Sequence, residues 1–387
     1  MRLEAADMRR IGEYREIFSY VSHFLKLCGT KKRIAGRKAS KEVSNMEEKL
    51  QMVRKIVPDL TEELVKRYRI LKTVRLLEPC GRRLVVISLG MTERTVRSEI
   101  EKLNAQGLVK VSKTGMSVTE DGLSVLENLS DLFSSLTGMS ELEEKVREIL
   151  GAQRVLLAQG NSDESDRTVK EMAQIGARVL LENMRRSSRI AITGGTTMAA
   201  LVEAMPYTAV QKAEMVLPAR GSIGRKLELQ ADTLAAKLAE KAGADYRMLH
   251  LPDNLSAYVL EEMKSEPEVA ETIDELKRVD ILLLGVGDAV EMAEKRRLDN
   301  DTCKLLRQEH AVAEACGYYF NHKGEVVYET NSIGVDFEEV HRMEHVIVSA
   351  GGKKKAASLL ALSKSMSNAV FIMDEGAALE MLRLAGL

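Results

Sequence analysis

Three features are scarce in this sequence, and each scarcity excludes a class of protein. There is no tryptophan among the 387 residues and only 4% are aromatic, which argues against a surface that stacks carbohydrates or single-stranded bases. The four cysteines form no CxxC pair, so neither a disulfide framework nor a zinc knuckle is indicated. No apolar run is long enough to cross a bilayer, and the sequence does not begin with a signal-peptide pattern. We expect a protein of a reducing, cytoplasmic compartment, without a membrane span.

The charge is divided unevenly along the chain. Residues 1–115 carry 26 Lys and Arg against 14 Asp and Glu, or +12, and the remainder carries 31 against 44, or −13. With 45% hydrophobic residues, the chain is long enough for two or three domains. A basic third joined to an acidic remainder favours a nucleic-acid-binding module attached to a domain with another task. A solvated basic face is the plain alternative.

Residues 1–45 differ in character from the rest of the chain and end in a basic, polar stretch. The tripeptide Lys41-Glu42-Val43 can be encoded by AAG GAG GTN, which spells a bacterial ribosome-binding site just upstream of the Met46 codon. We therefore expect translation to start at Met46, so that residues 1–45 are a disordered extension or an artefact of gene prediction. A genuine basic arm that touches DNA phosphates is the alternative.

Residues 46–135 are predicted to form a winged helix-turn-helix. Apolar residues recur at spacings of three and four after Pro58, and this first helix ends before Pro79. A short helix over 82–89 follows, and Thr92 then caps a third helix.

Behind that helix, two short strands over 108–112 and 116–119 predict a hairpin wing. A protein-interaction domain of the same three-helix shape is the alternative. The third helix would enter the major groove. The residues expected to contact DNA are Arg82, Arg83, Thr92, Glu93, Arg94, Arg97, Ser98 and Lys113.

Residues 136–387 are predicted to be an α/β domain, reached through a helical segment over 121–150. Short apolar runs alternate with amphipathic helices, which is typical of a doubly wound, mostly parallel sheet whose strands are buried on both faces. The expected strands are 155–157, 190–192, 215–217, 248–251, 281–284, 346–348 and 370–372, and the expected helices include 169–184, 229–242 and 355–362.

Glycine turns follow several of these strands. In the segment 193–197, Thr-Gly-Gly-Thr-Thr, glycines and a helix start can cradle a phosphate, although such a turn is also commonly structural. Similar turns with nearby cations occur at 218–221, 285–288 and 350–355. Ligands bind at the ends of strands in open α/β sheets, so we expect an anionic ligand with more than one phosphate.

One further motif is discounted. Residues 341–345 match the HxxEH pattern of zinc peptidases, but His345 leads directly into an expected strand, where the two histidines cannot share a helical face. No Ser/His/Asp set is recognisable. We expect no metal, no cofactor and no catalytic residue.

Together these residues resemble the SorC/DeoR-type sugar-responsive bacterial regulators, from about Met46 to the end. The likeness is carried by the winged helix and by five motifs, which are TGGTT at 193–197, PARG at 218–221, EACGYYF at 314–320, AGG at 350–352 and DEGAA at 374–378. The resemblance implies a Rossmann-like phosphosugar-binding effector domain behind the winged helix. It also implies that the protein is a repressor, a homodimer or homotetramer, that binds operator DNA upstream of a glycolytic operon.

The resemblance also implies the effector and its binding residues. The effector would be fructose-1,6-bisphosphate, which weakens DNA affinity or cooperativity. The implied binding residues are Gly194, Gly195, Thr196, Thr197, Arg220, Gln230, Arg296, Glu314 and Lys355, with the turn cradling one phosphate, Arg220 and Lys355 neutralising charge, and Gln230 and Glu314 holding hydroxyls. In the regulators that this chain resembles, an arginine pair occurs one residue earlier than Arg296-Arg297, and Lys295 stands here in place of its first arginine.

Two alternatives stay open. A regulator of the same type, activator or repressor, could sense another phosphosugar. Because the sugar-binding domain also looks related to phosphosugar isomerases, an enzyme is the second alternative, with Asp288, Glu314 and Asp374 as possible acids and bases.

Overall fold

The computed structural model describes residues 56, 58–221, 226–249, 251–252 and 255–387. The predictions for residues 1–45 and for a start at Met46 lie outside these residues. Residues Leu64–Leu387 form one compact unit. Among the described residues, no helix is both long and apolar enough to cross a membrane.

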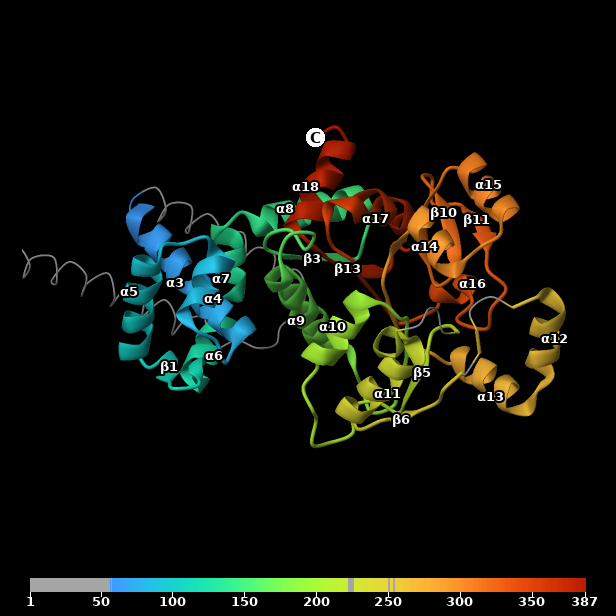
Figure 1. Ribbon diagram of the computed structural model, residues 1–387, viewed down its shortest axis with the longest axis horizontal. Helices are drawn as coiled ribbons and strands as arrows, with labels where there is room; N and C mark the ends of the chain where they lie inside the picture. The colour runs from blue at the N-terminus through green and yellow to red at the C-terminus, as the bar shows by residue number, and fades with distance from the viewer. Residues whose placement is uncertain (1–55, 57, 222–225, 250, 253–254) are drawn as a thin grey trace, which may run out of the picture. The chain divides into compact units, whose positions relative to one another are not determined.

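The winged helix-turn-helix is present in the order expected (Figure 1). The Thr92 hydroxyl accepts a hydrogen bond from the Thr95 N–H, which confirms the predicted N-cap. A core of its own, which includes Ile70, Val96 and Met116, joins the helices to the wing. Its elements are α3 (Pro58–Leu77), α4 (Arg82–Leu89), α5 (Glu93–Ala105), β1 (Val109–Ser112) and β2 (Gly115–Val118).

The segment expected to be helical behind the wing forms three helices. The ring of Phe133 stacks on Tyr68 of α3, with 3.6 Å between the ring centroids. The last of the three ends at Leu150 and is capped by Gly151, whose φ of 59° suits a glycine C-cap. These helices are α6 (Glu120–Asn128), α7 (Ser130–Leu136) and α8 (Met139–Leu150).

A seven-stranded parallel sheet forms the centre of the second half. Its order is β3-β13-β12-β7-β4-β5-β6, and every neighbouring pair is parallel. This confirms the doubly wound α/β fold. The strands are β3 (Arg154–Ala158), β4 (Arg189–Ile192), β5 (Met215–Pro218), β6 (Asp245–Tyr246), β7 (Ile281–Leu284), β12 (His345–Ser349) and β13 (Ala369–Asp374).

Helices cover both faces of this sheet (Figure 1). Alternate strand residues point to opposite faces, so Leu282 and Leu284 join one core and Ile281 and Leu283 join the other. One face carries α8, α17 (Ala356–Ser363) and α18 (Glu375–Leu384), and the other carries α9 (Asp166–Asn183), α10 (Thr196–Ala204) and α11 (Ala231–Ala242).

The strand predicted at 248–251 is wrong. The strand at this edge of the sheet is β6, three residues earlier, and His250 lies outside the described residues. The physical reason lies at Leu249, whose N–H donates to the buried Asp232 carboxylate at 2.7 Å instead of to a neighbouring strand. Leu249 is buried there, so the apolar residues of this segment reflect burial in the core and not pairing in a strand.

A second, four-stranded antiparallel sheet was not predicted. Its order is β11-β10-β9-β8, and α14 and α15 pack on it through a small core around Tyr319. Its elements are β8 (Gly287–Asp288), α14 (Ala289–Arg296), α15 (Asn300–Gln308), β9 (Ala311–Ala315), β10 (Tyr318–Asn321) and β11 (Val326–Glu329). The other described elements are η1 (Leu227–Leu229), α12 (Ala257–Ser265), α13 (Pro267–Leu276), α16 (Phe337–Val340) and η2 (Lys353–Lys355).

Candidate functional site

Four glycine turns meet at one edge of the parallel sheet. They follow β12, β7, β4 and β5, which are consecutive strands in the sheet order, so their carboxyl ends lie side by side. The turns enclose a cavity of about 550 Å³, which we call the effector cavity. All nine predicted binding residues line it, namely Gly194, Gly195, Thr196, Thr197, Arg220, Gln230, Arg296, Glu314 and Lys355.

The turn after β4 brings the backbone close to a second segment. A Cβ at Gly194 would lie 2.6 Å from the Leu229 carbonyl oxygen, so only glycine fits there. The Gly195 N–H donates to that same carbonyl at 2.9 Å. A ligand at this turn would therefore meet the Thr196 and Thr197 hydroxyls and the remaining N–H groups at the start of α10.

The cavity wall has an excess of positive charge. Five of the lining residues are cationic and two are anionic, a net of +3. Three of these charged residues, Lys226, Lys295 and Glu291, were not predicted to bind the ligand. The last two lie on α14, and the Lys-Arg run at 295–297 was the signal that could have found Lys295. An excess of cations around a polar cavity favours an anionic ligand.

The two arginines of the cavity are buried and held by protein groups. Arg220 donates to the Cys316 carbonyl, and to the carbonyl and hydroxyl of Thr330 at 2.7 and 2.5 Å. Arg296 donates to the Glu314 carboxylate at 2.6 Å. Glu314 also accepts the Gly317 N–H at 2.6 Å, which ties the arginines to the turn between β9 and β10. They build one wall of the cavity.

The lysines of the cavity are held more loosely. The Lys355 ammonium lies 3.4 Å from a Glu291 carboxylate oxygen, and Lys295 lies 4.0 Å from the same oxygen. The Lys355 charge, first among its neighbours, holds the pKa of the Glu291 carboxyl below its ordinary value. A carboxylate shared by two lysines at an open site is a weak partner, which an anionic ligand can replace.

Gln230 and Cys316 complete the wall of the cavity. Gln230 precedes α11 and is its N-cap residue. Burial raises the pKa of the Cys316 thiol to about 12, so this group stays neutral and is a poor nucleophile.

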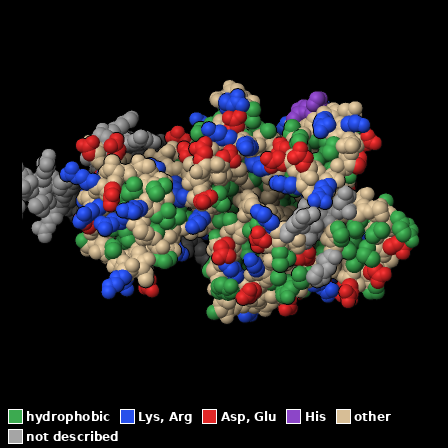
Figure 2. All heavy atoms as spheres, viewed as in Figure 1, with side chains coloured by type: hydrophobic (Ala, Val, Ile, Leu, Met, Phe, Trp, Pro, Cys, Tyr) green, Lys and Arg blue, Asp and Glu red, His purple; other side chains and the backbone are tan. Residues whose placement is uncertain are grey.

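The residues predicted to contact DNA all have exposed side chains. On the face drawn in Figure 2, Lys and Arg side chains gather over α5 and the wing. Arg97 pairs with Glu101 at 3.0 Å along the exposed face of α5, whereas the buried Glu99 binds Arg67 of α3 at 2.7 Å. The eight residues are Arg82, Arg83, Thr92, Glu93, Arg94, Arg97, Ser98 and Lys113.

The structure does not support a zinc site at the HxxEH motif. His345 begins β12, as the sequence predicted. Among the described residues, no group of three or more His, Cys, Asp or Glu could hold a metal ion. Cys80, Cys303 and Cys316 are free thiols, and Cys28 lies outside the described residues.

Comparison with known families accounts for both halves of the chain. The family described as "CggR N-terminal DNA binding domain" matches residues 64–133, and the family described as "Putative sugar-binding domain" matches residues 134–383. The chain belongs to the SorC family of sugar-binding transcriptional regulators. It is therefore a sugar-responsive transcriptional regulator with a DNA-binding domain and a sugar-binding domain, and not an enzyme.

Transcriptional regulators are also found among the curated proteins and solved structures that this chain resembles. The central glycolytic genes regulators of Priestia megaterium and Bacillus subtilis are each 36% identical to this chain, covering 86% and 87% of it and 98% and 99% of their own lengths. A SorC family regulator from Enterococcus faecalis has a TM-score of 0.59 at 31% identity, over 62% of this chain and 99% of that structure. The full-length SorC regulator of Klebsiella pneumoniae, at 15% identity and a TM-score of 0.58 over 78% of this chain, shares the fold.

Proposed function

We propose that this SorC-family regulator is a repressor of a glycolytic operon. Its affinity for operator DNA, or the cooperativity of that binding, falls when fructose-1,6-bisphosphate occupies the effector cavity. The observation that carries the proposal is the convergence of all nine predicted residues on one cavity with a net charge of +3. The names of the two 36% identical relatives support the glycolytic assignment. A cavity of about 550 Å³ has the size usual for small-ligand sites.

In this proposal the two ends of the cavity bind the two phosphates. The start of α10 binds one through Thr196, Thr197 and backbone N–H groups, because a helix N-terminus favours an anion. Lys355 and Lys295 bind the second, exchanging the Glu291 carboxylate for phosphate oxygens. Gln230 and the Arg296–Glu314 pair face the sugar between them.

Repression and its relief require two arrangements with different ligand affinity. The bisphosphate must bind the DNA-incompetent arrangement more tightly than the DNA-bound one, and DNA must weaken sugar binding by the same factor. We propose that the operator is bound by a homodimer or homotetramer, since symmetric regulators read repeated half-sites.

The test is binding of the full chain to labelled DNA from upstream of the nearest glycolytic operon, at fixed salt. Saturating fructose-1,6-bisphosphate should raise the Kd for DNA by roughly 5-fold to 150-fold, the usual range of allosteric coupling. Fructose-6-phosphate at the same concentration should leave the Kd unchanged. Equal effects of the two sugars would contradict the bisphosphate assignment.

A second candidate ligand is favoured by one relative. The deoxyribonucleoside regulator of Bacillus subtilis is 26% identical over 217 residues, which cover 54% of this chain and 68% of its own length. A SorC-type regulator, activator or repressor, that senses a deoxysugar phosphate or another monophosphate is therefore the alternative. Deoxyribose-5-phosphate belongs in the same binding experiment, and a response to it alone would decide for this alternative.

A further inference from the structure

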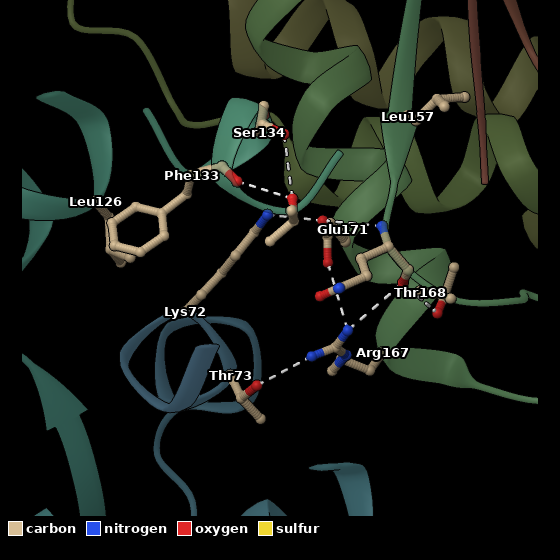
Figure 3. Close-up of polar contacts among 12 residues, drawn as sticks. Lys72, Thr73, Leu126, Phe133, Ser134, Leu157, Arg167, Thr168 and Glu171 are labelled. Carbon is tan, nitrogen blue, oxygen red and sulfur yellow. Dashed lines mark hydrogen bonds and ion pairs between the residues drawn. The ribbon is translucent and has the colours of Figure 1, made fainter. Parts of the chain in front are cut away.

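Two buried side chains of α9 hold α3 of the winged helix. The Lys72 ammonium lies 2.7 Å from a Glu171 carboxylate oxygen, and the Arg167 guanidinium donates to the Thr73 hydroxyl at 3.2 Å (Figure 3). Glu171, Arg167 and Thr73 are all buried. This contact joins the DNA-binding half to the sugar-binding half inside the compact unit Leu64–Leu387.

The same two side chains also hold the loop that follows β3. The Gln159 N–H donates to the Glu171 oxygen that binds Lys72, at 3.2 Å. The Gln159 carbonyl accepts from Arg167 at 3.5 Å and from the Thr168 hydroxyl at 3.1 Å. A single carboxylate oxygen therefore accepts hydrogen bonds from α3 and from this loop together.

The loop in turn contacts the glycine turn of the effector cavity. The buried Asp374 carboxylate accepts, on one oxygen, the Ser162 N–H at 2.7 Å and the Gly352 N–H at 2.8 Å. A Cβ on Gly351 would lie 2.6 Å from the Ser162 hydroxyl, so the two segments touch without space for a side chain. The Lys355 N–H donates to the Gly352 carbonyl at 3.0 Å, and Lys355 lines the cavity.

These contacts form one continuous chain from the cavity to α3. It runs from Lys355 through the turn at 351–352, Asp374, the loop at 159–163 and Glu171 to Lys72. Its two carboxylates are buried, so each hydrogen bond is costly to lose without replacement. Coupling the two sites through this network requires that it have two arrangements, with these hydrogen bonds made in one and exchanged in the other.

We propose that Glu171 is the positioning residue through which ligand binding at Lys355 changes the hold of the sugar-binding half on α3, and thereby the affinity for DNA. The proposal rests on the proposed function. Ligand phosphate attracts Lys355 and displaces the turn at 351–352. Asp374 binds both that turn and the loop at 159–163, so the loop moves with the turn. Glu171 keeps its hydrogen bond to the loop and loses the one to Lys72.

The experiment compares Glu171→Gln with the wild type and with Glu182→Gln, all as the full chain. Glu182 lies on the same helix, half-exposed, with partners 3.7 and 4.0 Å away, so its substitution is a matched control for charge loss from α9. Kd for operator DNA is measured with and without fructose-1,6-bisphosphate, and Kd for the sugar is measured without DNA. A thermal melt reports stability separately.

We expect the ligand-induced change in DNA affinity to fall to less than about twofold in Glu171→Gln, from the roughly 5-fold to 150-fold of an ordinary allosteric protein. Sugar affinity without DNA should stay within about threefold of wild type, and Glu182→Gln should keep the full response. A residue that served stability alone would lower the melting temperature and leave the ratio of the two DNA affinities unchanged.

A second variant covers the case in which Glu171→Gln does not fold. Lys72→Met removes the partly exposed partner of the same bond and should lose the response as well. If wild type neither binds the bisphosphate nor changes its DNA affinity, the proposed function is wrong and this inference falls with it. If wild type responds and Glu171→Gln and Lys72→Met respond by the same factor, the inference alone is wrong.

Discussion

The cations of the effector cavity differ in how firmly the protein holds them. The side chains of Arg220 and Arg296 are buried and bonded to carbonyl oxygens and to the Glu314 carboxylate. Lys355 and Lys295 share the half-exposed Glu291 carboxylate at 3.4 and 4.0 Å. Flexible ammonium groups with a weak partner can follow a ligand, whereas buried guanidinium groups in a bonded framework set the shape of the cavity.

The first prediction concerns Lys355. Replacing it with methionine keeps the bulk of the chain and removes the charge, so affinity for fructose-1,6-bisphosphate should fall by roughly 10-fold to 100-fold, the value of a hydrogen bond to a charged group. Isothermal titration calorimetry measures the change. Lys353→Met is the control, because Lys353 is exposed and does not line the cavity. Equal losses in the two variants would show that general charge, not contact, is responsible.

The β9–β10 hairpin beside the cavity has a restrictive turn conformation. Its two turn residues, Cys316 and Gly317, have φ of 50° and 79°, as a two-residue turn with a type I′ backbone requires. A Cβ on Gly317 would overlap the Arg220 guanidinium. This turn therefore fixes the carbonyl that Arg220 binds and excludes a side chain next to it.

The second prediction follows from that overlap. Gly317→Ala should lower stability by clearly more than the roughly 1–2 kcal/mol that a left-handed backbone costs an alanine, because Arg220 must also move. Gly151→Ala is the matched control, with φ of 59° and nothing within 4 Å of the new Cβ. Chemical denaturation of both variants measures the difference. Similar losses would mean that Arg220 gives way freely.

The sequence predicts the cavity better than the elements around it. Apolar runs predict β4 and β7, and glycines behind them predict the edge where a ligand binds, since parallel strands end together. The antiparallel sheet was not predicted because its strands are short and because Glu314, a charged residue buried in β9, interrupts the apolar pattern of that strand. Lys295 and Glu291 were missed for the same reason, since that sheet sets the position of α14.

At the scale of the whole molecule, the uneven distribution of charge can be counted directly from the sequence. Residues 1–115 carry +12 and the remainder −13. The predicted DNA contacts lie in the basic part with exposed side chains. A negatively charged sugar-binding half also repels DNA, which directs the phosphate backbone toward the winged helix.

The third prediction uses this charge division. Arg97→Ala should weaken DNA binding and lower the slope of log Kd against log salt by about one, because one phosphate contact is lost. Arg147→Ala is the control, since Arg147 is also exposed and paired with a glutamate on its own helix, but lies on α8. Fluorescence anisotropy over a salt series measures both slopes. An unchanged slope for Arg97→Ala would remove this residue from the DNA contacts.

The strand order also sets a sequence of events during synthesis. β3 pairs only with β13 among the described strands, so the sheet lacks a neighbour for its first strand until the ribosome has made residues 369–374. The hydrophobic core of the winged helix uses only residues 70–126, so all of its members have been made long before β13. At ~5–20 residues per second the delay is about tens of seconds. During that time the nascent chain contains its DNA-binding domain but not a complete sugar-binding domain. A product truncated ahead of β13 would lack part of the sheet that carries the cavity, and we expect it not to respond to the sugar.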